Sequence, residues 1–408
     1  MSKQEIRKAD VLRRLERGQI TQSEAGKILR LSTRQIRRLA KRLSEGGTKG
    51  LIHRGRGVAS KQATAVAVKE AVLRLGRTKY AGFNDRHLTE KLCEEEKLDV
   101  SRETVRRLLR GAGVGSPRKR RRKKHRSRRE RKPHAGMMML WDGSRHDWLE
   151  GRGPVLSLMG AVDDATGEML PGAQFYLQEG AEGYLRILYE TALEKGLPQS
   201  AYGDKHSSLC RNDDKWSLEE ELRGEQELTQ VGCAMRALCI NKLDAHSPQA
   251  KGRIERPWGT FQDRLVSELR LAGATSIEQA NDVLRRFRPQ YNKRFAIKPR
   301  EPLSAWRPVP KAVDLKRLCS FRYDAVVKND NTVQHARRVI QIPPGPKGRS
   351  YAKAHVELCQ LLDGSWRVYF EDALIAEATN TPLEELRALP KRKRSASSRA
   401  FRKAVLAA

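Results

Sequence analysis

The chain has 408 residues, and 82 Lys and Arg residues against 49 Asp and Glu residues give it a formal net charge of +33. That length suffices for two to four domains, and that charge attracts polyanions whatever the fold. No uncharged apolar run reaches about 18 residues, and the charged N-terminus lacks a signal-peptide core. We therefore expect no membrane segment, whereas a ribosomal protein, a nucleic-acid enzyme and a chromatin-like binder remain open.

Cysteine and glycine patterns argue against two common kinds of site. The six cysteines form no CxxC pair and no histidine pair has zinc-finger spacing, so we expect reduced thiols and no structural metal. The cysteines are Cys93, Cys210, Cys233, Cys239, Cys319 and Cys359. No GxxxxGK[ST] loop occurs, so we expect no nucleotide cofactor.

Residues 1–50 predict a helix-turn-helix DNA-binding domain. Thr21 and Glu24 can form a capping box, and Ser32 or Thr33 can cap the next helix, TRQIRRLAKRL. Two short helices around a tight turn, with arginines concentrated on the second, favour DNA binding over a helical bundle with a solvated basic face. The candidate DNA-binding residues are Arg34, Gln35, Arg37, Arg38 and Lys41.

Residues 51–115 predict a second helix-turn-helix-like domain. KEAVLRLGR, RHLTEKLCEEEK and SRETVRRLLRGAG have helical spacing, and Ser101 can cap the last of them. Arg102 and Arg106 are its candidate DNA-binding residues. Residues 116–134 follow as a basic linker whose like charges repel. A disordered linker and a clamp on DNA phosphates are both compatible with that segment.

Residues 135–310 predict an α/β core. The order of apolar runs is strand, strand, strand, helix, strand, helix, strand, helix, which suits a ribonuclease-H-like fold among several topologies. Residues 317–378 contain short strand-like runs that predict a small β-barrel. Residues 379–408 form a basic tail that we expect to be disordered. The predicted fold class is thus multidomain: all-α helix-turn-helix modules, a central ribonuclease-H-like α/β core and a C-terminal β-barrel.

Three acids stand where a carboxylate is hard to explain as structure. Asp142 follows the apolar run MMMLW, Asp204 follows AYG, and Glu255 lies in the helical segment SPQAKGRIERPW. In a ribonuclease-H-like sheet the first strand is central and the fourth lies beside it. Asp142 and Asp204 would then be neighbours, and Glu255 could face both. Each acid alone is more simply a turn former or a solvated side chain, but the trio in matching positions favours a shared site.

Such a trio suits phosphoryl transfer on DNA. Two divalent ions about 3.5–4 Å apart can activate the attacking oxygen and stabilise the leaving one, and Mg²⁺ prefers carboxylate oxygens. Lys251 and Trp258 would share a helical face with Glu255, where they could touch phosphate or base. The candidate DNA-binding residues of this segment are Lys251, Arg253 and Arg256.

Other polar residues are weaker candidates. Asp163 and Asp164 belong to the hairpin-like DDATG, and the remaining set-aside acids are Asp147, Asp213, Asp214 and Asp244. His206 and His246 could assist proton transfer or contact DNA, although surface or supporting roles are simpler.

Several motifs resemble the DDE transposases of bacterial insertion sequences, within the retroviral-integrase-like superfamily, and most closely the ISNCY group. They are WDGSRHDWLEGRGP, GAVDDATG, GDKHS and SPQAKGRIERPWGTFQDRLVSELRLAG, with TQSEAGKILRLSTRQIRRL and VSRETVRRLL in the helical modules. The chain departs from that pattern in two places. GDKHS stands where Thr-Asp-Arg-His is expected, and MMMLWDGS lacks a Gln before Asp-Gly-Ser.

The resemblance implies a catalytic triad of Asp142, Asp204 and Glu255 that binds two Mg²⁺ or Mn²⁺ ions. It implies nicking at transposon ends and attack of the freed 3′-hydroxyl on target DNA. The N-terminal modules would bind terminal inverted repeats, and a homo-oligomer would join two ends. We expect a cytoplasmic, nucleoid-associated bacterial protein. A catalytically silent DNA-binding regulator derived from a transposase is the alternative, and a basic structural nucleic-acid binder is a third.

Overall fold

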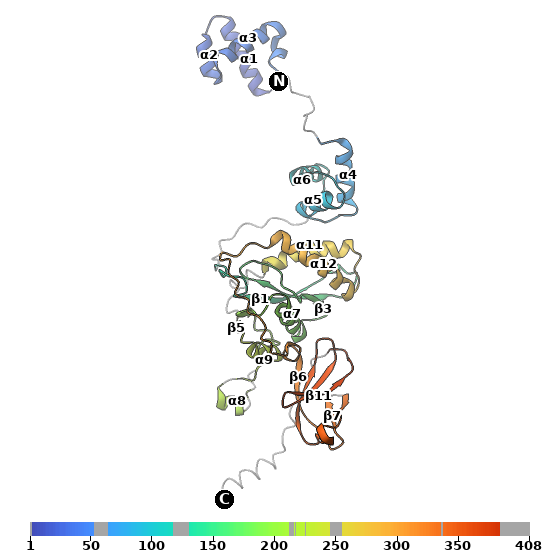
Figure 1. Ribbon diagram of the computed structural model, residues 1–408. Helices are drawn as coiled ribbons and strands as arrows, with labels where there is room; N and C mark the ends of the chain where they lie inside the picture. The colour runs from blue at the N-terminus through green and yellow to red at the C-terminus, as the bar shows by residue number, and fades with distance from the viewer. Residues whose placement is uncertain are drawn as a thin grey trace. The chain divides into compact units, whose positions relative to one another are not determined.

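The computed structural model describes residues 2–52, 64–116, 130–211, 216, 218–224, 226–244, 255–335 and 338–383. They divide into two compact units, Met1–Ala71 and Val72–Ala408 (Figure 1). Among these residues no helix has the length and apolar character needed to cross a membrane. Most of the predicted basic linker and of the basic tail lies outside the described residues. The domain boundaries expected from the sequence stay predictions.

The first unit contains a helical bundle. Its elements are α1 (Lys3–Glu16), α2 (Gln22–Leu29), α3 (Thr33–Gly46) and the 3-10 helix η1 (Gly47–Leu51). Each α-helix begins at a capping box, including the predicted Thr21–Glu24 box and one at Ser32. A Cβ on Gly26 would lie 2.8 Å from the Leu31 carbonyl oxygen, so the tight turn into α3 requires glycine there.

A second helical module, α4–α6, precedes the core. It comprises α4 (Val66–Arg77), α5 (Asp85–Glu94) and α6 (Arg102–Gly111), and Ser101 caps α6 as predicted. Leu88 and Leu109 are buried within it. A Cβ on Gly76 would lie 3.0 Å from Leu109 and 3.4 Å from Leu88, so α4 packs closely on the other two helices.

The core is built on a five-stranded mixed sheet in the order β3-β2-β1-β4-β5. Its strands are β1 (Met139–His146), β2 (Leu156–Asp163), β3 (Gln174–Tyr176), β4 (Ser200–Gly203) and β5 (Asn241–Asp244). β1, β2 and β3 pair antiparallel, whereas β1–β4 and β4–β5 pair parallel. The first strand is therefore central and the fourth lies beside it, as predicted from the order of elements.

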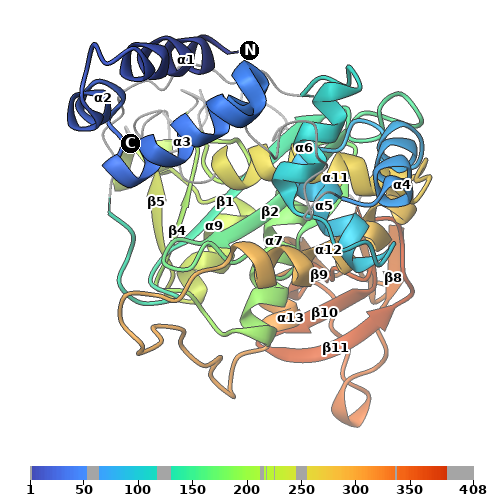
Figure 2. The ribbon, with the colours of Figure 1, turned by 90° about the horizontal axis from the view of Figure 1, so that it is seen from above.

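Helices cover both faces of this sheet (Figures 1 and 2). Met139 and Trp141 of β1 join one core with α7 (Ala181–Glu194) and α9 (Gln230–Ala237). Leu140 of β1 joins the other core with α11 (Glu255–Leu271) and α12 (Ile277–Phe295). Because side chains alternate along a strand, even-numbered residues of β1 face α11 and odd-numbered residues face α7.

One predicted helix is two. The segment EEELRGEQELTQVG forms α8 (Leu218–Arg223) and α9, because Gly224 takes a left-handed φ of 71° and Thr229 caps a new helix by accepting from the Gly232 N–H. The sequence pattern supports both helices but does not reveal the break between them.

The C-terminal region is rich in β-structure. After α13 (Leu315–Leu318), a four-stranded antiparallel sheet has the order β11-β10-β9-β6, and β7 and β8 form a separate pair. The elements are β6 (Phe321–Val326), β7 (Thr332–His335), β8 (Arg338–Gln341), η2 (Pro346–Gly348), β9 (His355–Gln360), β10 (Trp366–Phe370) and β11 (Ala373–Ala378). Val333 and Ile340 of the pair share a core with Leu358 and Val368 of the sheet. Within the described strands the two sheets share no hydrogen-bonded ladder, so a closed barrel is not found.

Candidate functional site

The register of β1 and β4 brings Asp142 and Asp204 to adjacent positions. Met139 pairs with Ala201 and Leu140 pairs with Tyr202 in parallel. Continued by two residues, that register sets Asp142 opposite Asp204, which directly follows β4. The two acids are thus neighbours, as the order of strands predicted, and both are partly exposed.

Asp142 is tied to α11 by a hydrogen bond. The Trp258 Nε1–H donates to Asp142 Oδ2 at 3.2 Å, and the indole also lies against β2, where a Cβ on Gly160 would be 3.0 Å from it. Trp258 is buried, so its ring packs inside the core and does not offer the open face that could have touched phosphate or base. Glu255 is the first residue of α11, three positions before Trp258. Its side chain lies outside the described part of the structure.

The loop after β4 folds back on Asp204. Asp204 Oδ1 accepts from the His206 backbone N–H at 3.1 Å, which is the local turn that a short acidic side chain favours. The His206 Nδ1 lies 3.7 Å from Glu179 Oε1. His206 thus stands beside the predicted site, whereas His246 lies outside the described residues.

Glu179 and Tyr184 adjoin the same part of the sheet from the α7 side. Tyr184 is fully buried and donates from its hydroxyl to Glu179, and a Cβ on Gly143 would overlap the Glu179 carboxylate. Burial raises the pKa of Tyr184, and the charges of Glu179, Asp204 and Asp142 raise it further. No sequence signal marked Glu179, because an acid just before a helix is ordinarily a capping residue.

Three of the acids that were weaker candidates in the sequence are held by hydrogen bonds within the fold. Asp163 is buried and accepts hydrogen bonds from the Gly136 N–H and from the Thr166 N–H and hydroxyl. Burial raises the pKa of Asp163 despite these donors. Asp164 is buried and accepts from the Lys132 N–H at 2.7 Å. Asp147 is exposed, and its carboxylate accepts from Gly151.

The chemistry of Asp142 and Asp204 fits a divalent cation. Carboxylate oxygens are the donors that Mg²⁺ takes most readily. Among the described residues, no group of three or more His, Cys, Asp or Glu side chains is arranged to hold a metal ion. The β1–β4 register brings Asp142 and Asp204 together. Glu255 is the first residue of α11, whose Trp258 is hydrogen-bonded to Asp142.

The predicted DNA-binding residues of α3 are exposed but not equivalent. Gln35 closes the capping box of its own helix, Arg37 donates to Gln22 at 3.1 Å, and Lys41 lies 3.6 Å from Glu45. Within the described residues, no hydrogen bond or ion pair holds Arg34 or Arg38. Among the predicted residues of α3, these two arginines therefore have guanidinium groups that no other described side chain engages.

The remaining basic candidates lie on α6 and near α11. Arg102 and Arg106 are exposed on α6, where Arg106 pairs with Glu103 at 2.5 Å. Arg256 is exposed in the first turn of α11. Lys251 and Arg253 lie outside the described residues.

Comparison with known proteins finds relatives that match most of the chain. Residues 7–57 match the family described as a helix-turn-helix domain. The putative transposase y4bF of Sinorhizobium fredii is 35% identical over 366 residues, covering 89% of this chain and 78% of that protein. The transposase for insertion sequence IS1202 of Streptococcus pneumoniae is 28% identical over 371 residues, covering 82% and 77%.

A chain of the simian T-cell lymphotropic virus intasome in complex with a PP2A regulatory subunit superposes with a TM-score of 0.31 at 13% identity. The match covers 76% of this chain and 99% of that chain. At that TM-score the two structures are not alike enough to compare residue by residue.

An N-terminal helix-turn-helix and a mixed α/β core define a DNA-binding protein with a candidate acidic site, which confirms the predicted helix-turn-helix. The chain belongs to the transposase family of the two bacterial relatives, as the motifs predicted.

Proposed function

We propose that this protein nicks transposon ends and joins the freed 3′-hydroxyl to target DNA, using Asp142, Asp204 and Glu255 as its catalytic carboxylates. The observation that carries the proposal is the pairing register of β1 and β4 together with the Trp258–Asp142 hydrogen bond. Through them two acids share a sheet position, and the helix that begins with the third acid is attached to the first.

In this proposal the three carboxylates hold two divalent ions, Mg²⁺ or Mn²⁺, which would activate the attacking oxygen and stabilise the leaving one. The chain itself supplies orientation. Trp258 fixes the Asp142 carboxylate and the His206 N–H fixes that of Asp204. The basic α3 and α6 would hold the terminal inverted repeats, and the reacting protein would be a homo-oligomer that joins two ends.

The closing test is strand transfer by the full chain with Mg²⁺ on duplexes taken from the DNA that borders the gene. Asp142→Ala and Glu255→Ala should abolish nicking and joining but leave end binding intact, because neither carboxylate is needed to hold the duplex. Asp147→Ala is the matched control, since this exposed acid stands one residue after β1 and should keep wild-type activity.

Two outcomes would contradict the proposal. Joining by Asp142→Ala at the wild-type rate would remove the proposed triad. End binding by wild type without nicking in either Mg²⁺ or Mn²⁺ would favour the alternative, a silent DNA-binding regulator derived from a transposase.

A further inference from the structure

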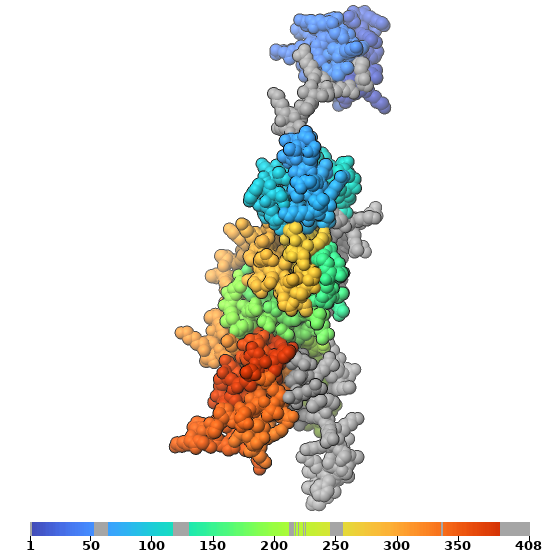
Figure 3. Space-filling view, turned by 90° about the vertical axis from the view of Figure 1, so that its right-hand side faces the viewer, coloured from blue at the N-terminus to red at the C-terminus, as the bar shows by residue number. Residues whose placement is uncertain are grey.

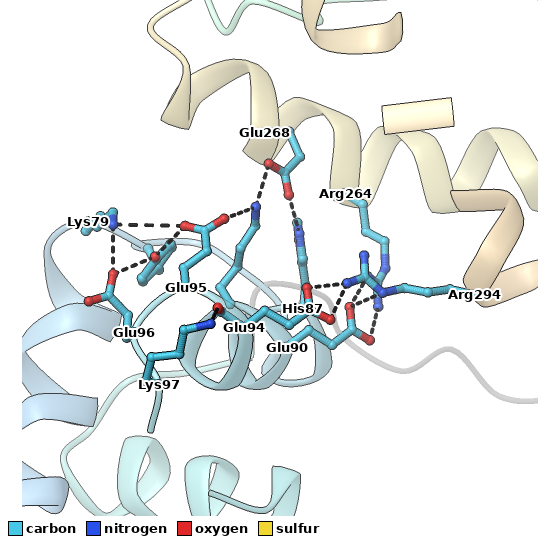
Figure 4. Close-up of polar contacts among 12 residues, drawn as sticks. Lys79, His87, Glu90, Glu94, Glu95, Glu96, Lys97, Arg264, Glu268 and Arg294 are labelled. Atoms are coloured by element: carbon cyan, nitrogen blue, oxygen red, sulfur yellow. Dashed lines mark hydrogen bonds and ion pairs between the residues drawn. The ribbon is translucent and has the colours of Figure 1, made fainter. Parts of the chain in front are cut away.

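The α4–α6 module is attached to the core through a polar interface on α11 and α12. Figure 4 shows side chains of α5 meeting those of the two core helices, and Figure 3 shows the module (blue to cyan) against α11 and α12 (yellow to orange). Arg264 of α11 donates to both oxygens of Glu90, the farther at 3.1 Å. Arg294 of α12 donates to both oxygens of Glu94 at 2.6 and 2.5 Å.

A second set of contacts centres on Glu268 of α11. His87 Nε2 lies 2.7 Å from one Glu268 oxygen, and Lys91 Nζ donates to the other at 2.9 Å. Asn84, which caps α5, also donates to Asp263. The α5 partners recur every three or four residues, so they form one stripe along the helix.

The polar side chains at the centre of this interface are largely withdrawn from water. The side chains of His87, Arg264 and Glu268 are 3%, 5% and 16% exposed. Buried ion pairs are poor sources of stability but demand close geometry, because a charge that loses its partner has no water to replace it. An interface of this kind therefore fixes how two elements align more than it strengthens their association.

The docked module leaves its basic helix uncovered. The contacts to α11 and α12 come from α5 and the turn before it, where Arg270 donates to the Ala81 carbonyl oxygen. Arg102, Arg106 and Arg107 of α6 remain exposed. Because α11 is continuous from Glu255 to Leu271, Arg264 stands roughly 13 Å along the helix axis from Glu255. One helix thus carries the proposed third carboxylate at its first turn and the module's partners farther along.

We propose that Glu90, Arg264 and Glu268 are positioning residues, which set the register between duplex DNA on α6 and the active-site end of α11. The inference rests on the proposed function and deepens it, because it assigns the choice of the nicked phosphate to this interface. DNA bound to α6 then lies at a fixed distance from the three proposed catalytic acids. If the interface between α5 and α11 is loosened, the same DNA takes up varying positions relative to those acids.

The test uses the full chain on a duplex from the DNA bordering the gene, with hydroxyl-radical footprinting and nucleotide-level mapping of nicks. The variants are Glu90→Arg, Arg264→Glu and their double exchange, in which Arg294 keeps Glu94 as a partner. Arg285→Glu is the matched control. It makes the same charge change as Arg264→Glu, in an exposed pair with Asp282 at 3.0 Å on α12.

We expect each single variant to protect the same nucleotides as wild type where the helical modules bind. The protection that the core gives should become weaker and extend over more nucleotides. Nicks should spread to neighbouring phosphates, and the nicking rate should fall on the order of a hundredfold, as for a small misplacement of reacting groups. The double exchange should bring back the wild-type footprint and nick, and Arg285→Glu should never lose them.

Single variants with a wild-type footprint and nick would overturn the inference. A folded double variant whose footprint is as diffuse as those of the single variants would also overturn it. So would a wild-type protein in which α6 gives the DNA no protection. A wild-type protein with the fixed two-part footprint but no nick would instead reject the proposed function and leave the positioning role standing.

Discussion

At the scale of single residues, the Trp258 indole gives Asp142 a fixed orientation. An indole N–H can only donate, so its partner must be an acceptor, and here that is Asp142 Oδ2 at 3.2 Å. A carboxylate held in one orientation loses less rotamer freedom when it binds a cation than a mobile one does. The indole therefore prepares Asp142 for the task proposed for it.

Replacing Trp258 with Phe should slow nicking while the fold persists. The ring still fills its buried space, but the charge-assisted hydrogen bond, worth about 1.5–3 kcal/mol, is lost. If that orientation is used in the reaction, nicking should slow by about tenfold or more, measured on end DNA with Mg²⁺.

Trp148→Phe provides the comparison for that experiment. Trp148 is also buried and donates its indole N–H to the Ser144 carbonyl oxygen at 3.0 Å. Its replacement should lower the melting temperature but not the rate per folded molecule. Equal rates for Trp258→Phe and wild type would show that Asp142 needs no such support.

The placement of residues could be predicted where it depends on position along a strand. Asp142 and Asp204 follow recognisable apolar runs, so their adjacency follows from the topology. Trp258 offered no comparable signal, because an aromatic side chain in a basic segment suits DNA contact and burial equally well. Glu179 was missed because it reaches Gly143 only through the packing of α7 on the sheet.

At the scale of elements, the α5–α11 interface should respond to acid. Burial raises the pKa of Glu268, but hydrogen bonds from His87 and Lys91 outweigh it and leave that pKa below its ordinary 4.5. A depressed carboxyl pKa contributes stability above pH 4.5 that is lost as pH falls through the lower folded value. Lys91 behaves oppositely. Burial lowers its pKa, yet Glu95 and Glu268 raise it above 10.5, so its contribution persists until strong alkali.

Glu268→Gln isolates this effect because glutamine does not titrate. The unfolding free energy of the second unit should be higher for wild type than for the variant at neutral pH, measured by calorimetry. The difference should shrink as the pH falls below 4.5. A difference that stays constant into stronger acid would contradict the assigned role of the ionised carboxylate.

Helix starts were the most predictable feature at this scale. Thr21 and Ser101 cap their helices because a side-chain oxygen can accept from a backbone N–H near by in sequence. The break between α8 and α9 was missed, because helical spacing continues across Gly224. The polar stripe of α5 was not foreseen either, since charged residues at helical spacing usually face water.

At the scale of the whole molecule, a net charge of +33 attracts any duplex, so discrimination must come from particular side chains. Arg38→Ala on α3 should weaken binding to end DNA by about tenfold if this arginine reads a base. Arg7→Ala on α1 removes the same charge from an exposed position and should have a smaller effect. Titration of both variants with end DNA and unrelated DNA at one salt concentration provides the check. Equal losses would move recognition away from α3.

The overall organisation was predictable in its order and less so in its closure. The strand order of the core follows from alternating elements and short connections. The C-terminal strands were equally visible, but whether six short strands form one barrel or two sheets depends on ladders between residues far apart in sequence. Val333 and Leu358 share a core without such a ladder, a packing that alternation alone does not encode.

The pairing of β1 with β4 also limits how related genes can vary in length. A single codon gained or lost between Met139 and Asp142 would turn the acid to the α7 face, since successive side chains of a strand point to opposite sides. The same change in a surface connection, such as the one between β2 and β3, would leave Asp142 opposite Asp204. Length variation among functional members of the family should therefore be absent from the first half of β1 and concentrated in the loops.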